Sequence, residues 1–350
     1  MKKILAMAMV ALLVMTTFVG CGSNKSADNG KKMKIVTTIF PPYDFAKKIG
    51  GDKADVSLLL KPGAESHTYE PTPQDIKKIQ ESDIFIYTGG ENDDWVKKIL
   101  ASMGDKKPKV LKLVDMVKTV EEEHVEGMQE EDHDHDKDEH KKGDHDKDEH
   151  KKGDHDKDEH KGDSHKKDKH EESEHEIDEH VWTSPKNADK IAKTIYEEMA
   201  KVDKDSKDKF EKNYKELKGQ LDDLDKEIRE VVKNGKRKTI LFGDRFPFRY
   251  LAKEYGLKYY AAFSGCSKDA EASAQTVKFL INKVKKEKLP VVFTIEMSNG
   301  KVAKSIVEAT GAKQLMLHSL HNLTEDELKA KKTYVDLMKD NIKNLKQALN

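Results

Sequence analysis

The sequence predicts an α/β protein with two lobes. Each lobe is a roughly four-stranded, mostly parallel sheet flanked by helices, and a long rigid helix links the two. Short β-rich segments alternate with helical patterns early in the chain, the alternation returns near its end, and a long amphipathic pattern stands between. Such alternation is typical of parallel sheets, because a crossover between parallel strands normally contains a helix. A chain of 350 residues is long enough for two domains of ordinary size.

The first residues are interpreted as a targeting signal. Lys2 and Lys3 precede an apolar run, residues 4–19, that is shorter than a membrane-spanning helix. The run ends in Phe18-Val19-Gly20-Cys21, which resembles a bacterial lipoprotein signal in which Cys21 is lipidated. We therefore expect a signal peptide over 1–20, a polar tether over 21–33, and an extracytoplasmic protein held to the cell membrane by a lipid on Cys21.

The N-terminal lobe is expected to span residues 34–186. Its strands are predicted where β-branched and aromatic residues cluster, at 34–39, 55–60, 83–88 and 109–113. A helix is expected over 43–49. Another should begin after Thr72, which can cap it, with Pro73 at the first helical position.

Linking helices are predicted over 187–235, with a break near residues 203–206. The second piece has apolar residues at helical spacing, namely Phe210, Tyr214, Leu217, Leu221, Leu224, Ile228 and Val232. A helix of ~26 residues would be ~39 Å long, which is enough to connect the lobes and to limit their hinge motion. The C-terminal lobe follows over 236–350, with strands at 239–242, 257–262, 290–295 and 312–317. Its helices are expected at 248–255, 271–285, 301–310 and 334–348.

One segment interrupts this pattern. Residues 121–178 consist mostly of Asp, Glu, Lys, Gly and His, with a short polar repeat, and a histidine falls on every fifth residue from His135 to His180. A segment so polar cannot bury a core and should be disordered. Imidazole and carboxylate are ligands for divalent transition metals, so this tract predicts metal binding. It could collect metal near a tighter site, sense excess metal, or act only as a solvated spacer.

Composition excludes some classes of protein. The formal net charge is -1, whereas a nucleic-acid binder would show a basic excess, so no nucleic acid is expected as a partner. Cys266 is the only cysteine besides Cys21, so acylation of Cys21 would leave no intramolecular disulfide.

Two histidines stand where a site would form. His67 lies in a Pro/Gly-rich loop directly after a predicted strand, where α/β sheets place ligands, and His180 stands at the entry to a helix. His318 and His321 lie beyond the last predicted strand and are interpreted as surface or structural residues.

The segments around His67 and His180 resemble the cluster A-I substrate-binding proteins of metal ABC transporters, and among them the zinc-binding ZnuA/AdcA type. Residues 62–73 resemble the family motif Pro-Gly-x-x-x-His-x-Tyr-Glu-Pro-Thr-Pro. Residues 178–185 resemble Asp-Pro-His-x-Trp-x-Ser-Pro, with Glu179 in place of the family's Pro. The resemblance runs from about residue 34 to 350. It implies a monomeric receptor, not an enzyme, that captures Zn²⁺ between its lobes through His67 and His180 and delivers it to a membrane ABC permease.

The chain departs from the family at the third ligand. In an ungapped match Gly243 takes that position, so Asp244 is the nearest competent group, and Cys266, water or a histidine of the tract are the alternatives. Glu296 takes the fourth position, shifted by one residue. Because oxygen-rich sites suit manganese, the missing histidine keeps Mn²⁺ open as the cargo. A secreted zinc enzyme is less favoured, since the chain has no His-Glu-x-x-His, and nothing in the residues supports an adhesin independently.

Overall fold

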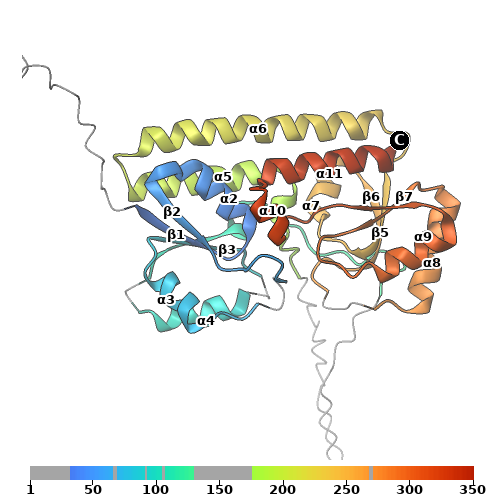
Figure 1. Cartoon of the computed structure of the whole chain (residues 1–350), viewed down its shortest axis with the longest axis horizontal. Coiled ribbons are helices and arrows are strands. Elements are labelled where there is room, and N and C mark those ends of the chain that lie inside the picture. Colours follow the sequence, from blue (N-terminus) through green and yellow to red (C-terminus); the bar gives the residue numbers. More distant parts are fainter. Residues whose placement is uncertain (1–31, 66–68, 91–92, 105–106, 130–175, 268–270) are drawn as a thin grey trace, which may run out of the picture.

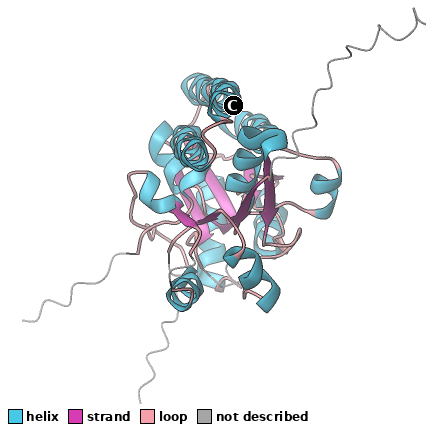
Figure 2. Cartoon of the chain, turned by 90° about the vertical axis from the view of Figure 1, so that its left-hand side faces the viewer, coloured by secondary structure: helices cyan, strands magenta, loops and turns pink. Residues whose placement is uncertain are grey.

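The two predicted lobes lie side by side beneath long helices (Figure 1). The computed structural model describes residues 32–65, 69–90, 93–104, 107–129, 176–267 and 271–350. Each lobe contains a four-stranded parallel sheet, and helices lie above and below the strands (Figure 2). The predicted fold class is therefore confirmed. Cys21, His67 and the tract histidines from His135 to His175 lie outside the described residues.

The N-terminal sheet has the strand order β2-β1-β3-β4. Its strands are β1 (Met33–Thr37), β2 (Ala54–Leu58), β3 (Ile84–Tyr87) and β4 (Lys109–Lys112), all paired in parallel. Its helices are α2 (Phe40–Gly50), α3 (Pro73–Gln80) and α4 (Asp94–Ser102), with 3-10 turns at Gly51–Lys53 and Leu113–Met116. Thr72 caps α3 as predicted, since its side chain accepts a hydrogen bond from the amide of Asp75.

The C-terminal sheet repeats this arrangement in the order β6-β5-β7-β8. Its strands are β5 (Thr239–Arg245), β6 (Lys258–Phe263), β7 (Val291–Thr294) and β8 (Lys313–Met316). The helices that follow them are α7 (Arg249–Tyr255), α8 (Ala274–Glu287) and α9 (Lys301–Thr310). In both lobes the first strand in sequence is therefore central, and the loops after the strands open at one edge.

The link between the lobes is a layer of helices. The predicted helices are α5 (Pro185–Val202) and α6 (Lys207–Asn234), and the predicted apolar series of α6 is buried along its whole length. The C-terminal helix α11 (Tyr334–Leu349) runs beside α6 (Figure 1). One hydrophobic core contains residues of both sheets, α5, α6 and α11. None of the described helices is both long and apolar enough to cross a membrane.

Two segments leave their own lobe and dock on the other. The first begins at the tract, whose described ends are residues 121–129 and 176–178. Glu121 pairs with Ile177 in an antiparallel bridge, and the amide of Asp178 donates to the carbonyl of Val120 at 3.0 Å. The amide of Gln129 then donates to the carbonyl of Ala262 in β6 at 2.8 Å. These ends belong to the folded part of the chain, although the sequence placed them in the disordered segment.

The second crossing segment follows β8 and returns to the N-terminal lobe. The amide of Phe40 donates to the carbonyl of His321 at 2.9 Å, and the amide of Gly63 donates to the carbonyl of Leu323 at 2.8 Å. The side-chain amide of Asn322 donates to the carbonyl of Ala64 at 3.0 Å. Residues 317–324 are therefore held between the lobes before the short helix α10 (Glu325–Lys329) begins.

Glu327 fixes the end of this second segment. It accepts hydrogen bonds from the amide and hydroxyl of Thr324, both at 2.9 Å, in a capping box, and lies 3.4 Å from Nε2 of His318. Partial burial raises the pKa of Glu327, but the hydrogen bonds from His318 and Thr324 outweigh this and lower the pKa to about 2.

Glu327→Gln should therefore destabilise the protein by about 1 kcal/mol at pH 7. Since the folded pKa lies below the usual 4.5, the ionised carboxylate contributes stability above pH 4.5 and loses it as the pH falls toward 2. Urea unfolding of both proteins at several pH values should show the difference shrinking on acidification. The exposed neighbour Glu325→Gln is the matched control, and a pH-independent difference would contradict the assignment.

Candidate metal centre

His180 is a fully buried imidazole held by a carboxylate. It precedes the 3-10 turn Val181–Thr183 and has no exposed surface. Its Nδ1 lies 3.2 Å from Oδ1 of Asp178, and its backbone amide donates to the same oxygen at 2.8 Å. Burial by itself would lower the pKa of His180, but the Asp178 carboxylate more than offsets this and the pKa is raised. Because Nδ1 faces Asp178, Nε2 is the nitrogen whose chemistry suits a metal.

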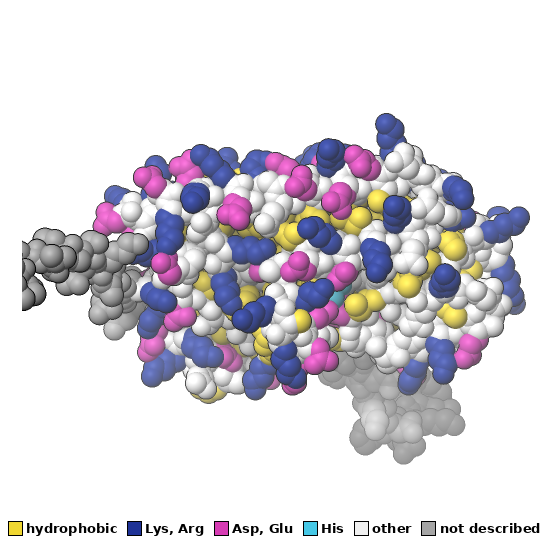
Figure 3. Space-filling model, turned by 45° about the horizontal axis from the view of Figure 1, so that its top comes forward, with side chains coloured by type: hydrophobic (Ala, Val, Ile, Leu, Met, Phe, Trp, Pro, Cys, Tyr) yellow, Lys and Arg dark blue, Asp and Glu magenta, His cyan; other side chains and the backbone are white. Residues whose placement is uncertain are grey.

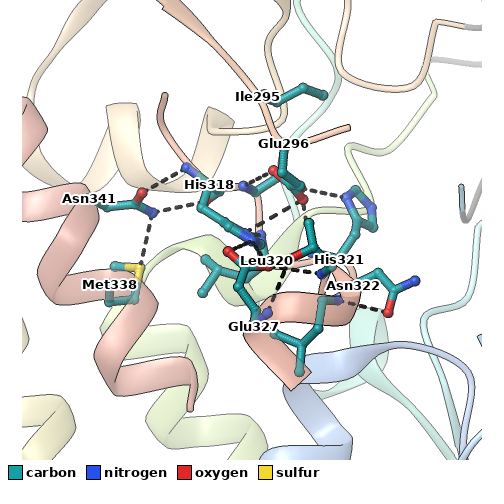
Figure 4. Close-up of polar contacts among 12 residues, drawn as sticks. Ile295, Glu296, His318, Leu320, His321, Asn322, Glu327, Met338 and Asn341 are labelled. Carbon is teal, nitrogen blue, oxygen red and sulfur yellow. Dashed lines mark hydrogen bonds and ion pairs between the residues drawn. The ribbon is translucent and has the colours of Figure 1, made fainter. Parts of the chain in front are cut away.

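Glu296 follows β7 and is buried on the facing lobe. One carboxylate oxygen accepts a hydrogen bond from the amide of Ser319 at 2.7 Å, and the other accepts from the Ser319 hydroxyl. His318 lies on the same carboxylate, with its Nδ1 at 3.6 Å (Figure 4). Met297, the next residue, has a left-handed backbone with φ of 58°.

His321, which was interpreted as a surface or structural residue, lies beside His180. The two ring centroids are 4.7 Å apart and the rings are almost perpendicular. The Trp182 ring lies 4.8 Å from that of His321, and Nδ1 of His321 is 3.0 Å from the hydroxyl of Ser319. One available signal could have found it, because His321 follows a strand of a parallel sheet, as His67 does.

His318 has the structural role that the sequence suggested as one alternative. It is buried, its Nδ1 accepts a hydrogen bond from the amide of Leu320 at 2.9 Å, and its Nε2 lies 3.4 Å from Glu327. The side chain of Asn341 in α11 makes two hydrogen bonds with the backbone of His318: it donates to the carbonyl and accepts from the amide (Figure 4).

Asp244, the predicted third ligand, makes its contacts with the backbone. Its carboxylate accepts hydrogen bonds from the amides of Arg245 at 2.9 Å and Ile295 at 3.3 Å, so it joins the ends of β5 and β7. Burial raises its pKa. A Cβ at Gly243 would lie 2.4 Å from Cα of Ala303 in α9, so position 243 faces a helix. Asp244 does not line the cavity described next.

A cavity between the lobes joins these elements. Ala64 and Glu65 line it from the N-terminal lobe, immediately before His67 in the sequence. Glu296, Ser319 and His321 are among the residues that line it from the other side. His180 borders it at Gly265, where a Cβ would lie 3.1 Å from Cε1 of its ring. Figure 3 shows a histidine surface near the middle of the face it presents, among interspersed acidic and basic side chains.

Arg245 and Cys266, which lie at or beside the cavity, make contacts within the protein. Arg245 at the cavity pairs with Glu65 across the lobes at 2.8 Å. Cys266 is a partly buried free cysteine whose amide donates to Oε1 of Glu122 at 3.0 Å, and desolvation raises the pKa of its thiol. Within the described part of the chain, no three His, Cys, Asp or Glu side chains lie close enough together to hold a metal ion.

Comparison with known proteins identifies the family. A family model described as the periplasmic zinc-uptake complex component A, ZnuA, matches residues 35–348. The chain belongs to this family. Within the ZnuA family, the zinc-binding lipoprotein AdcA of Streptococcus pneumoniae strain R6 is 34% identical over 348 residues, which cover 99% of this chain. The chain spans only 61% of that relative's length.

One further relative and one solved domain structure match over nearly their full length. The high-affinity zinc uptake system protein ZnuA of Bacillus subtilis strain 168 is 34% identical over 337 residues, covering 94% of this chain and 92% of that protein. The crystal structure of the Zn(II)-bound ZnuA-like domain of S. pneumoniae AdcA superposes with a TM-score of 0.68 at 31% identity, covering 91% of this chain and 99% of that domain.

Tyr250 of α7 binds the backbone on both sides of the tract, at Val120 and at Asp178 beside His180. Its hydroxyl donates to the carbonyl of Asp178 at 2.7 Å and accepts from the amide of Val120 at 3.2 Å. Tyr250→Phe leaves both backbone groups without this partner and should lower the free energy of unfolding by about 1–3 kcal/mol. Urea denaturation measures this.

Tyr260→Phe is the control, since that half-buried hydroxyl accepts a hydrogen bond from the Lys283 side chain at 3.1 Å and should contribute less than about 0.5 kcal/mol. Equal effects of the two substitutions would contradict the role given to Tyr250.

Proposed function

We propose that this chain is the extracytoplasmic substrate-binding protein of a zinc ABC transporter, anchored through Cys21, and that it captures Zn²⁺ between its lobes. The observation that supports this most is the fully buried, carboxylate-backed His180 at an interlobe cavity, in a ZnuA-family chain. Delivery to a membrane ABC permease follows from the family's role in uptake. The predicted ligand His67 would enter from the loop that follows Glu65, and Glu296 would act from the facing lobe.

The ligand chemistry favours zinc over manganese. Carboxylate-backed imidazoles suit Zn²⁺, whereas Mn²⁺ prefers sites dominated by oxygen. His180 and His321 bring two imidazoles to one side of the cavity, while Asp244 is engaged by backbone amides. The names of the relatives AdcA and ZnuA, a zinc-binding lipoprotein and a zinc-uptake protein, support the same choice.

The His-rich tract is proposed to serve this site without forming it. Its two described ends pair at the Glu121–Ile177 bridge, and Asp178 at its exit holds His180. Metal bound weakly by the tract would thus be held at high local concentration near the cavity. A sensor role would use the same proximity, with tract occupancy acting on Asp178.

Lobe closure around the ion should be modest. The lobes share one hydrophobic core, and both crossing segments span the gap. The ion pair between Arg245 and Glu65 also crosses it at 2.8 Å. A metal ligated from both lobes would add a further bond across the same gap.

Tight zinc binding should survive removal of the tract. A variant with residues 130–175 replaced by a Gly/Ser linker keeps the paired ends and should retain one tight site in competition titrations with a chelator. The weak sites present in the full chain should disappear. His180→Gln in the same background should weaken the tight site by roughly 100-fold or more, because a buried ligand is lost.

Loss of tight binding on removal of 130–175 would contradict the cavity assignment. Mn²⁺ is titrated in parallel, and tighter binding of Mn²⁺ than of Zn²⁺ would contradict the choice of cargo.

The ring of His180 should also be sensitive to its neighbour Gly265. An added Cβ there lies 3.1 Å from Cε1 and 3.3 Å from Nδ1, so the ring must shift by a few tenths of an ångström. Gly265→Ala should therefore weaken zinc binding roughly tenfold, comparable to perturbing the surroundings of a ligand. Gly219→Ala in α6 is the matched control, since its Cβ meets no atom within 4 Å, and it should leave affinity unchanged. Unaltered affinity in Gly265→Ala would argue against His180 as a ligand.

A further inference from the structure

We propose that His321 supplies the imidazole ligand that this chain lacks after β5, and that it binds the same ion as His180. This inference rests on the proposed function, because it completes the same interlobe site. His321 reaches the site from the segment after β8, so the ligand comes from a different strand end of the C-terminal lobe.

The separation of the two rings fits a shared ion. Two imidazoles bound to one tetrahedral zinc, with Zn–N bonds near 2.0–2.1 Å, have ring centroids about 5 Å apart. His180 and His321 have centroids 4.7 Å apart with an interplanar angle of 88°. Binding of one ion by both Nε2 atoms would require the rings to turn from this edge-to-face contact.

In both histidines Nδ1 has a hydrogen-bonding partner, as is usual for a histidine that binds metal through Nε2. Nδ1 of His180 faces Asp178 directly. Nδ1 of His321 faces the Ser319 hydroxyl, which in turn donates to Glu296. A carboxylate behind Nδ1 fixes the ring and raises the basicity of Nε2. Glu296, the predicted fourth ligand, would thus also position His321 through Ser319.

The surrounding backbone is built to hold His321 in place. Trp182, two residues after His180, donates from its indole nitrogen to the carbonyl of Ser319 at 2.8 Å. Leu320 is fully buried and adopts a left-handed backbone with φ of 68°, as Met297 does beside Glu296. Non-glycine residues pay energy for this conformation, and such strain concentrates at functional sites. Here it flanks the two residues of the relay, Glu296 and His321.

The other candidates for the missing ligand are less suitable. Position 243 faces Ala303 in α9, Asp244 accepts hydrogen bonds from two backbone amides, and neither Asp244 nor Cys266 lines the cavity. Among these candidates, His321 combines a ring that contacts His180 with a cavity-lining position.

The test uses the variant with 130–175 replaced, loaded with Zn²⁺. His321→Gln should weaken zinc binding by roughly 100-fold or more in chelator competition, while Asp244→Asn should stay within about threefold. His124→Gln, which alters an exposed histidine, is the matched control and should change nothing. In the apo form the thermal midpoint of His321→Gln should match the parent, and only its zinc-induced rise should be reduced.

A second measurement does not depend on any substitution folding. Zinc titration of protein labelled with ¹⁵N-histidine should shift Nε2 of both His180 and His321 with the same stoichiometry. An unshifted His321, or parental affinity in His321→Gln, overturns the proposal that His321 is a ligand. If His180→Gln still loses binding in that case, the proposed function stands. If zinc moves neither ring and His180→Gln binds normally, the interlobe zinc site itself is wrong.

Discussion

The reciprocal crossing of the two lobes is the constraint on which the site depends. Residues 121–129 leave the N-terminal lobe and bind β6 through Gln129, while residues 317–324 leave the C-terminal lobe and bind the loops around Phe40 and Gly63. The first crossing segment begins beside residues 177–178, just before His180, and the second contains His321. Asp178, whose carboxylate holds His180, donates its amide to Val120 just before the first crossing begins, and the second crossing carries His321 to the cavity. The interlobe contact is therefore made of backbone hydrogen bonds as well as a shared core.

The architecture was readable from the sequence because its signals are local. Alternating strand and helix patterns predicted the eight strands of the two sheets, and the apolar series from Phe210 to Val232 predicted α6. The position of α11 beside α6 was not predicted, because packing between distant helices leaves no local periodicity. The ends of the tract were assigned to disorder for the same reason, since their order comes from a single bridge and contacts with the other lobe.

The site was only partly predictable. His180 stood out because its motif is contiguous, and the structure places it in a buried, carboxylate-held position. His321 was interpreted as surface or structural, because its place depends on an irregular segment folding back on a lobe more than two hundred residues earlier. Asp244 was chosen by proximity in an ungapped match, yet its carboxylate satisfies two strand-end amides. Sequence proximity to a ligand position does not fix the direction of a side chain at a strand end that contains a bulge.

The pairing of the tract ends has a consequence for how the insertion can change. The bridge between Glu121 and Ile177 holds the two ends of the insertion together. The folded part of the protein therefore fixes both ends of this loop. For a tract as disordered as the sequence predicts, each doubling of loop length costs only about 0.6 kcal/mol in closure entropy. Copies of the decapeptide repeat that begins at Asp134 could thus be gained or lost with little effect on folding. If the tract collects metal as proposed, its capacity and the geometry of the interlobe site would therefore be able to vary independently in the same chain.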